Sequence, residues 1–210
     1  VIFPPLPEQR RIADILSTVE EQIQLTDKLI DETRELKKGL SNDLFLNGVG
    51  HDNHKNIQLG PKQFEIPQEW QIKQISEVCD DIIDYRGKTP PYSDSGIPHI
   101  RNFNIEENRL IMDDIDYVSE ETYDEWMTRG IPQEGDVFFT TEAPLGKAAL
   151  VPDFQFSLAQ RLVVLQPGDE ITGEWLMYLL TSDFMKEYYH TRATGSTVKG
   201  LSNRALQKVK

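Results

Sequence analysis

A heptad pattern near the start of the chain constrains the fold more than any other feature. From Glu8 to about Leu46 the sequence contains no proline and a single glycine. Apolar or small residues recur at alternating spacings of four and three, at Ile12, Leu16, Val19, Ile23, Thr26, Ile30, Thr33 and Leu40. This is the spacing of a coiled-coil seam, and Leu25, Leu29 and Leu36 widen it into a second stripe. The pattern predicts one continuous helix of about 38 residues, about 57 Å long at about 1.5 Å per residue.

Such a helix needs a partner along its length. It is bounded by Pro4, Pro5 and Pro7 before it and by Asn47-Gly48-Val49-Gly50 after it. One interpretation is an arm that packs on its own domain, and the other is a coiled coil with another chain or another copy. We favour the second, because one compact domain of about 150 residues cannot cover two apolar stripes along such a helix.

The rest of the chain lacks the heptad pattern and consists of a polar segment followed by short apolar segments. Residues 51–63 are polar and predict a linker, in which His51 and His54 are solvated and form no metal site, since no third ligand lies nearby. From Phe64 onward, short apolar segments alternate with turns such as Asp94-Ser95-Gly96 and Pro167-Gly168-Asp169. The expected organisation is a long helical region over 1–50, a linker over 51–63 and a domain over 64–210.

The domain over 64–210 is expected to be α+β with a mixed, mainly antiparallel sheet, because long crossover helices between strands are missing. The predicted strands are Trp70 to Ile75, Pro98 to Ile100, Asp116 to Val118, Asp136 to Thr140, Ala148 to Val151 and Arg161 to Gln166. The predicted helices are Ile75 to Cys79, Glu120 to Thr128, Gly173 to Ser182 or beyond, and Asn203 to Lys208.

Charge and cysteine content restrict the function. The chain has no apolar run long enough to span a membrane, no signal peptide and one cysteine, Cys79, which predicts a cytoplasmic protein with a buried structural thiol. The formal net charge is −13, and a uniformly acidic chain repels phosphate. The charge is unevenly distributed along the chain. The segment from Asn104 to Glu125 contains nine acidic residues and one arginine, whereas five basic residues and no acidic residue follow Glu187. Any contact with nucleic acid must therefore be local.

The stretch Thr89-Pro90-Pro91-Tyr92 is one residue away from the Asn/Asp-Pro-Pro-Tyr/Phe loop of amino-methyltransferases. Those enzymes use a carbonyl oxygen of the first residue to accept a hydrogen bond from the base, whereas Thr89 offers only a hydroxyl. The residues before it do not form a continuous apolar strand, and no glycine-rich cofactor turn occurs in the chain. Phosphate-loop, zinc-protease and nucleophile-elbow motifs are also missing, so we expect a non-enzymatic protein without its own cofactor.

Several predicted loops combine hydrogen-bonding side chains with local positive charge. Such side chains contact phosphates and base edges, although for each loop alone ordinary turn chemistry is the simpler interpretation. We expect base contacts from Arg101, Asn102, Gln160 and Arg161. The expected phosphate or positioning contacts, with flanking residues of the same loops, are Arg86, Lys88, Thr89, Thr140, Thr141, Ser196, Thr197 and Lys199.

Taken in order, these segments resemble the DNA-specificity subunit of type I restriction-modification systems. The segments that carry the resemblance are Pro4 to Ala13, Ile66 to Trp70, Arg86 to Pro90, Gly96 to Arg101, Gly135 to Thr140, Leu158 to Arg161 and Gly195 to Thr197. The resemblance covers essentially the whole chain, with one helix and one target-recognition domain where the family has two of each. It implies either half of a full subunit, a C-terminal fragment, or a half-size subunit that works as a dimer.

The resemblance further implies that each recognition domain reads one half of a bipartite site in double-stranded DNA. Two long helices pair antiparallel, and methyltransferase (modification) and restriction/translocase subunits assemble on this scaffold. S-adenosylmethionine, ATP and magnesium would then belong to the partner subunits alone. The alternatives that remain are a coiled-coil protein-interaction module without DNA readout, which the acidic stretch favours, and a nucleobase methyltransferase, which would have to bind S-adenosylmethionine.

Overall fold

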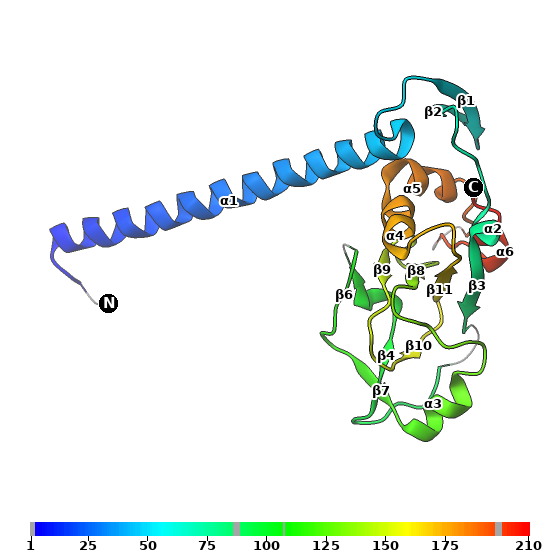
Figure 1. Cartoon of the computed structure of the whole chain (residues 1–210). Helices are drawn as coiled ribbons and strands as arrows, with labels where there is room; N and C mark the ends of the chain where they lie inside the picture. Colours follow the sequence, from blue (N-terminus) through cyan, green and yellow to red (C-terminus); the bar gives the residue numbers. More distant parts are fainter. Residues whose placement is uncertain (1–2, 86–88, 107, 196–198) are drawn as a thin grey trace. The chain divides into compact units, whose positions relative to one another are not determined.

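The computed structural model describes residues 3–85, 89–106, 108–195 and 199–210 (Figure 1). The chain divides into two compact units, Val1–Asp43 and Leu44–Lys210. The predicted fold class is confirmed, because a long N-terminal helix precedes a mixed, mainly antiparallel α+β unit. Within the described part of the chain, no helix is both long and apolar enough to cross a lipid bilayer.

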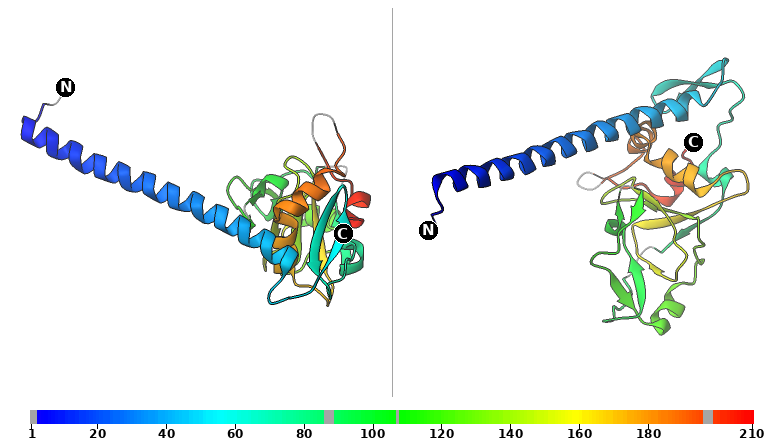
Figure 2. Two further views of the ribbon diagram at one scale, coloured as in Figure 1. Left: turned by 90° about the horizontal axis from the view of Figure 1, so that it is seen from above. Right: turned by 60° about the vertical axis from the view of Figure 1, so that its left-hand side comes forward.

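The first unit consists almost entirely of helix α1, Leu6–Asn47, which Figures 1 and 2 show as one unbroken helix. None of its residues is buried, and the predicted seam is exposed, with half of the surface of Val19 and Ile23 accessible. Two seam threonines bond back into their own helix: Thr26 Oγ1 donates to Gln22 O at 2.8 Å and Thr33 Oγ1 to Leu29 O at 2.7 Å. Their hydroxyls can therefore enter an apolar interface without losing a hydrogen bond.

The second unit is built on a four-stranded antiparallel sheet in the order β3-β11-β8-β9. Its strands are β3 (Cys79–Asp84), β11 (Leu162–Pro167), β8 (Val137–Thr140) and β9 (Ala148–Leu150). Because side chains alternate along a strand, Phe139 faces one side of this sheet and Phe138 the other, and both are fully buried. The sheet is therefore covered on both faces.

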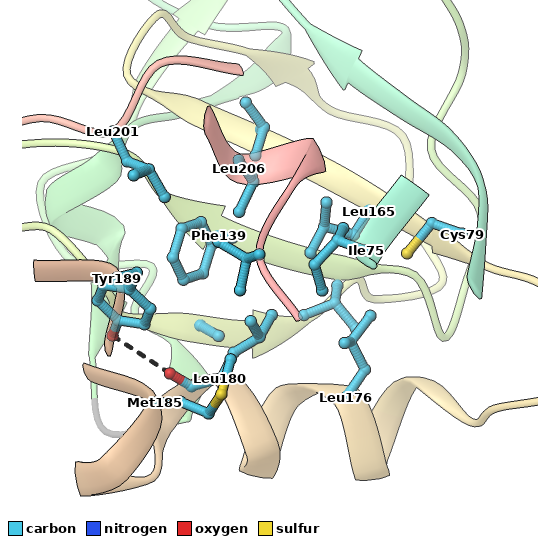
Figure 3. Close-up of a cluster of buried hydrophobic side chains, with 14 of the residues drawn as sticks. Ile75, Cys79, Phe139, Leu165, Leu176, Leu180, Met185, Tyr189, Leu201 and Leu206 are labelled. Carbon is cyan, nitrogen blue, oxygen red and sulfur yellow. Dashed lines mark hydrogen bonds between the residues drawn. The ribbon is translucent and has the colours of Figure 1, made fainter. Parts of the chain in front are cut away.

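Helices cover the face that carries Phe139 (Figure 3). They are α2 (Ile75–Val78), α4 (Gly173–Thr181), α5 (Asp183–His190) and α6 (Asn203–Gln207). Tyr189 is fully buried in this core and donates its hydroxyl to Leu180 O at 3.2 Å (Figure 3). Gly146 has a φ of +90°, and a Cβ there would lie 2.0 Å from Tyr189 Oη, so glycine is required at this point.

A smaller sheet and one helix cover the face that carries Phe138. The sheet is β10-β4-β7, formed by Ser157–Leu158, Ile97–Ile100 and Asp116–Val118, with β10 parallel to β4. Helix α3, Glu120–Trp126, is capped by Ser119, whose hydroxyl accepts from Thr122 N. A 3-10 turn, Asn102–Asn104, and a short hairpin of β5 (Ile105–Glu106) and β6 (Arg109–Leu110) follow β4.

Three local predictions are wrong. The segment 51–63 is no simple linker, because it contains β1 (His54–Leu59), which pairs with β2 (Lys62–Pro67) in a hairpin with Leu59 and Ile66 buried. The strand predicted from residue 70 to 75 is a turn and a loop, since Trp70 N bonds to Pro67 O and β2 has already ended. Strand β3 was not expected because it is an edge strand, in which exposed acids accompany the buried Ile83. The division of the chain into functional domains at 50 and 64 stays a prediction.

Candidate nucleic-acid interface

Strand register brings the ends of several strands to one place. Leu162, at the start of β11, pairs with Thr140 at the end of β8, and its neighbour Val163 pairs with Asp84 at the end of β3. In the smaller sheet, Leu158 at the end of β10 pairs with Ile100 at the end of β4. Only three residues join β10 to β11. The loops that leave these strand ends therefore lie next to one another.

Backbone hydrogen bonds tie the loops together. Thr141 N donates to Arg161 O and Leu201 N donates to Thr141 O, each at 2.9 Å, so three segments distant in sequence form a row. Ala159 N donates to Ile100 O at 2.9 Å, which joins the loop after β4 to this row. The surface is therefore built on main-chain contacts that hold each loop in register.

Two adjoining concavities lie on this surface. The first, of about 280 Å³, is lined by Thr141, Glu142, Gln160, Arg161, Thr194, Gly200, Leu201 and Ser202. The second, of about 190 Å³, is lined by Thr89, Tyr92, Arg101, Asn102, Ala159, Gln160 and Arg161. Gln160 and Arg161 line both. The structure thus brings together six residues that sequence reasoning singled out, namely Thr89, Arg101, Asn102, Thr141, Gln160 and Arg161.

The other residues predicted to contact DNA do not line either concavity among the described residues. Thr140 is fully buried, and its hydroxyl accepts a hydrogen bond from Lys147 N at 2.9 Å, so its proposed DNA contact is withdrawn. Lys199 is exposed beside Gly200, which lines the first concavity. Arg86, Lys88, Ser196 and Thr197 lie outside the described residues.

Arg101 and Asn102 are held by protein contacts. The Arg101 guanidinium forms an ion pair with Asp116, donates from Nη2 to Asp114 O at 2.8 Å and lies 4.0 Å from the centre of the Phe103 ring. The Asn102 amide donates to Glu142 O at 3.2 Å and to Ala143 O at 2.5 Å. Both side chains therefore stabilise the loops in this conformation.

Gln160 and Arg161 are more available. Within the described residues, no hydrogen bond involves the Gln160 side chain, and Arg161 has one ion pair, with Nε 2.9 Å from Oε1 of Glu142. Sequence reasoning missed Glu142 because an acid was not expected in a phosphate-facing loop. The signal that could have indicated it is its position directly after Thr140-Thr141. Tyr92 is half exposed and lines the second concavity.

A buried histidine lies under this surface. His99 Nδ1 is 2.7 Å from Ser157 Oγ, and its ring centre is 5.5 Å from that of Tyr92. Burial, followed by the positive charge of Arg101, lowers the pKa of His99 to about 4, although Asp116 opposes the shift. Both His99 and Ser157 are buried, so no substrate can reach this pair, and we interpret it as structural.

The His99 shift has a consequence for stability against pH. The unfolded chain binds a proton at His99 below about pH 6.5, whereas the folded chain binds it only below about pH 4. The free energy of unfolding should therefore decrease as the pH is lowered from 6.5 to 4, and His99 accounts for at most about 3 kcal/mol of this decrease. We expect the His99→Asn variant, which keeps a polar atom near Ser157, to lose less stability over this range in urea titrations. Parallel curves for the two proteins would contradict the assignment.

The structure also bears on the methyltransferase interpretation of Thr89 to Tyr92. A strand, β3, does precede this loop, which the sequence did not indicate. However, β3 is an edge strand antiparallel to β11 and not a buried parallel strand, and Thr89 still lacks a side-chain carbonyl. Among the described residues, no group of three or more histidines, cysteines and acids is placed to hold a metal ion. Burial, with Asp80 and Asp136, raises the pKa of Cys79 to about 12, as expected for a structural thiol.

Comparison with known proteins points to one class. No protein-family model matches the chain. The chain is 25% identical over 195 residues to the type I restriction enzyme MjaVIII specificity subunit of Methanocaldococcus jannaschii, covering 88% of this chain and 44% of that protein. It is 24% identical over 215 residues to the putative MjaX specificity subunit of the same organism, covering 99% and 47%. The chain therefore spans about half the length of the curated relatives it matches.

Solved structures agree in fold. The HsdS subunit of Thermoanaerobacter tengcongensis superposes with a TM-score of 0.53 at 20% identity, over 99% of this chain and 46% of that one. The type I restriction-modification S subunit of M. genitalium gives the same TM-score at 13% identity, over 97% and 48%. The resemblance inferred from the sequence motifs is thus confirmed in sequence and in fold.

Proposed function

We propose that this chain, which resembles the specificity subunits of type I restriction enzymes in sequence and in fold, recognises one half of a bipartite site in double-stranded DNA. The loops around the two concavities would approach the major groove, with no recognition helix involved. The observation that carries the proposal is the meeting of Thr89, Arg101, Asn102, Thr141, Gln160 and Arg161, from four loops, on one concave surface. Their side chains are of the types that contact phosphates and base edges.

The acidic charge of the chain is compatible with this proposal. The two described arginines that line the concavities are paired with acids, Arg101 with Asp116 and Arg161 with Glu142, so among the described residues this lining carries little excess charge. Sequence-independent attraction to phosphate would therefore be weak, and affinity would depend on base contacts and on partner subunits. We propose that methyltransferase subunits supply the remaining electrostatic affinity and bind S-adenosylmethionine, and that restriction subunits bind ATP and magnesium.

The function is tested by mapping N6-methyladenine in the source genome. Deletion of the gene for this chain should abolish methylation at one bipartite motif and leave other motifs unchanged. Reintroduction of the gene should restore that motif. Unchanged methylation at every motif, in cells that express the chain and its partner subunits, would contradict the proposal.

Two substitutions separate base readout from phosphate contact. Gln160→Ala should weaken binding to the target by about 1 to 3 kcal/mol and relax the preference at one base pair. Lys199→Ala should weaken binding to all sequences alike and reduce the slope of log affinity against log salt by about 1. The measurement is a binding titration of the assembled methyltransferase with target and scrambled DNA at several salt concentrations. An unchanged preference at every base pair in Gln160→Ala would remove Gln160 from the readout.

A protein-interaction module without DNA readout is the second candidate. It is favoured by an apolar groove of about 530 Å³ in the second unit, whose lining includes Phe45, Ile72, Trp175 and Leu179. Large exposed apolar surface often marks a protein contact. Under this alternative, the partner subunits would bind target and scrambled DNA with equal affinity. This would hold both for the complex assembled with this chain and for the partner subunits alone.

A further inference from the structure

Arg161 has an unusual backbone conformation for an arginine. Its φ is +71°, in the left-handed region that side chains other than glycine and asparagine seldom adopt. The conformation is held on both sides, because Arg161 O accepts from Thr141 N at 2.9 Å and Leu162 is paired with Thr140 in the β8–β11 ladder. Uncommon conformations that the surrounding structure enforces concentrate at functional sites.

The guanidinium of Arg161 is held on one side only. Its Nε is 2.9 Å from Oε1 of Glu142, and within the described residues Nη1 and Nη2 have no partner. About half of the Arg161 side chain is accessible, so a ligand can reach these two nitrogens. A pair of parallel N–H donors matches O6 and N7 of guanine, the two acceptors that guanine presents in the major groove.

Glu142 is itself fixed in place. The Asn102 amide donates to the carbonyl oxygens of Glu142 and Ala143, and Glu142 forms a β-bridge with Gly200. An added Cβ at Gly200 would lie 3.2 Å from Glu142 Oε2, so the Glu142 side chain lies directly against the Gly200 backbone. These contacts fix the backbone of Glu142, and its carboxylate lies beside the Nε side of Arg161.

The other arginine of the surface differs in this respect. Arg101 already has a protein partner at both terminal nitrogens, Asp116 at Nη1 and Asp114 O at Nη2, and its side chain is less accessible than that of Arg161. Of the two arginines expected from sequence to read bases, only Arg161 keeps both terminal nitrogens without a partner among the described residues.

We propose that Arg161 reads the N7 and O6 edge of a guanine through Nη1 and Nη2, and that Glu142 is the positioning residue that orients it. The proposal rests on the proposed DNA-recognition function. Glu142 has a second effect, because its negative charge opposes binding of Arg161 to phosphate and so favours the base contact over sequence-independent contacts. The structure thus explains why an acid belongs in a DNA-facing concavity.

The test uses the assembled methyltransferase and its target duplex, with each guanine of the recognised half-site replaced in turn by 7-deazaguanine, which lacks the N7 acceptor. One replacement should weaken binding of the unaltered protein about 10- to 150-fold, the range for the loss of one hydrogen bond to a charged donor. Arg161→Met keeps most of the length of the side chain but has no N–H donor, and should bind both duplexes equally. If the losses of binding free energy from the Arg161 substitution and from the 7-deazaguanine replacement add when the two changes are combined, Arg161 does not contact that N7 and the assignment is wrong.

Glu142→Gln keeps the size of the side chain and removes its charge. We expect target affinity to fall about two- to five-fold, as for a partly exposed ion pair, while affinity for scrambled DNA stays equal or rises. Glu125→Gln, an exposed acid in α3, is the matched control and should change neither value. A purely structural role for Glu142 would lower both affinities together and would overturn the positioning role.

The two proposals fail in different ways. If the complex discriminates target from scrambled DNA but no guanine is coupled to Arg161, the guanine proposal is wrong and the proposed function stands. If the complex shows no discrimination at all, both are wrong.

Discussion

We propose that copies of this chain pair through α1, and we expect the Ile23→Glu variant to be monomeric at concentrations at which the unaltered chain forms this dimer. Ile23 lies in the heptad seam of α1 and is half exposed in the single chain, as are its seam neighbours Val19 and Ile30. Full burial of such a side chain contributes about 1.5 to 3 kcal/mol, and Ile23 is already half buried, so two of them contribute about 1.5 to 3 kcal/mol to the dimer. The glutamates also bring two like charges into an apolar interface. The dimer dissociation constant should therefore rise by more than about 10-fold.

Sedimentation equilibrium of the chain over a wide concentration range measures this change directly. Gln24→Glu is the matched control, because it adds the same charge one residue further along, on the side of the helix away from the seam. Circular dichroism at 222 nm should show similar helix content in both variants when they are compared at the same fraction of dimer. A chain that is monomeric at all concentrations without any substitution would show that copies of this chain do not pair through α1.

This prediction connects the helix to the proposed function. A reader of one half-site needs a second reader held at a fixed separation, and a helix of 42 residues extends over about 63 Å at about 1.5 Å per residue. The seam threonines already satisfy their hydroxyls within α1, so dimer formation costs no hydrogen bond at those positions. Pairing of α1 with an equivalent helix would convert single-site contacts into bivalent binding.

The long helix was predictable because its signal is local. Heptad spacing and the absence of helix-breaking residues are properties of a continuous stretch, and the structure follows them from Leu6 to Asn47. The hairpin of β1 and β2 was missed for the opposite reason. Its buried positions, Leu59 and Ile66, are separated by polar residues that alternate with them, and only the pairing with the opposite strand makes the pattern a sheet.

The candidate interface was predictable in its residue types but not in its arrangement. Arg101, Gln160 and Arg161 could be chosen from their chemistry and their flanking turns. Their proximity depends on long-range pairing, such as Leu158 with Ile100 and Leu162 with Thr140, which no local pattern indicates. The same holds for Glu142, whose function as a support for Arg161 follows from a distance and not from its neighbours in sequence.

The second large effect is expected from Phe139→Ala, which should destabilise the 44–210 unit by about 3 to 5 kcal/mol. Phe139 is fully buried in β8, a central strand of the main sheet, and its ring centre is 5.6 Å from that of Tyr189 in an edge-to-face contact (Figure 3). Truncation leaves a cavity between the sheet and the helices that rigid strands on both sides cannot close. The contact with Tyr189 is lost as well.

Tryptophan fluorescence during urea denaturation isolates this effect. All three tryptophans, Trp70, Trp126 and Trp175, lie in the second unit, so the signal reports its unfolding and not that of α1. The matched control is Phe154→Ala, which removes the same side chain from an exposed position and should change the free energy of unfolding by less than about 1 kcal/mol. Strand β8 ends at the row formed by Thr141, Arg161 and Leu201. Under the proposed function, Phe139→Ala should therefore also lose the preference for target over scrambled DNA at temperatures at which Phe154→Ala keeps it. A cost at Phe139 no larger than the cost at Phe154 would show that the two faces of the sheet do not form the core described above.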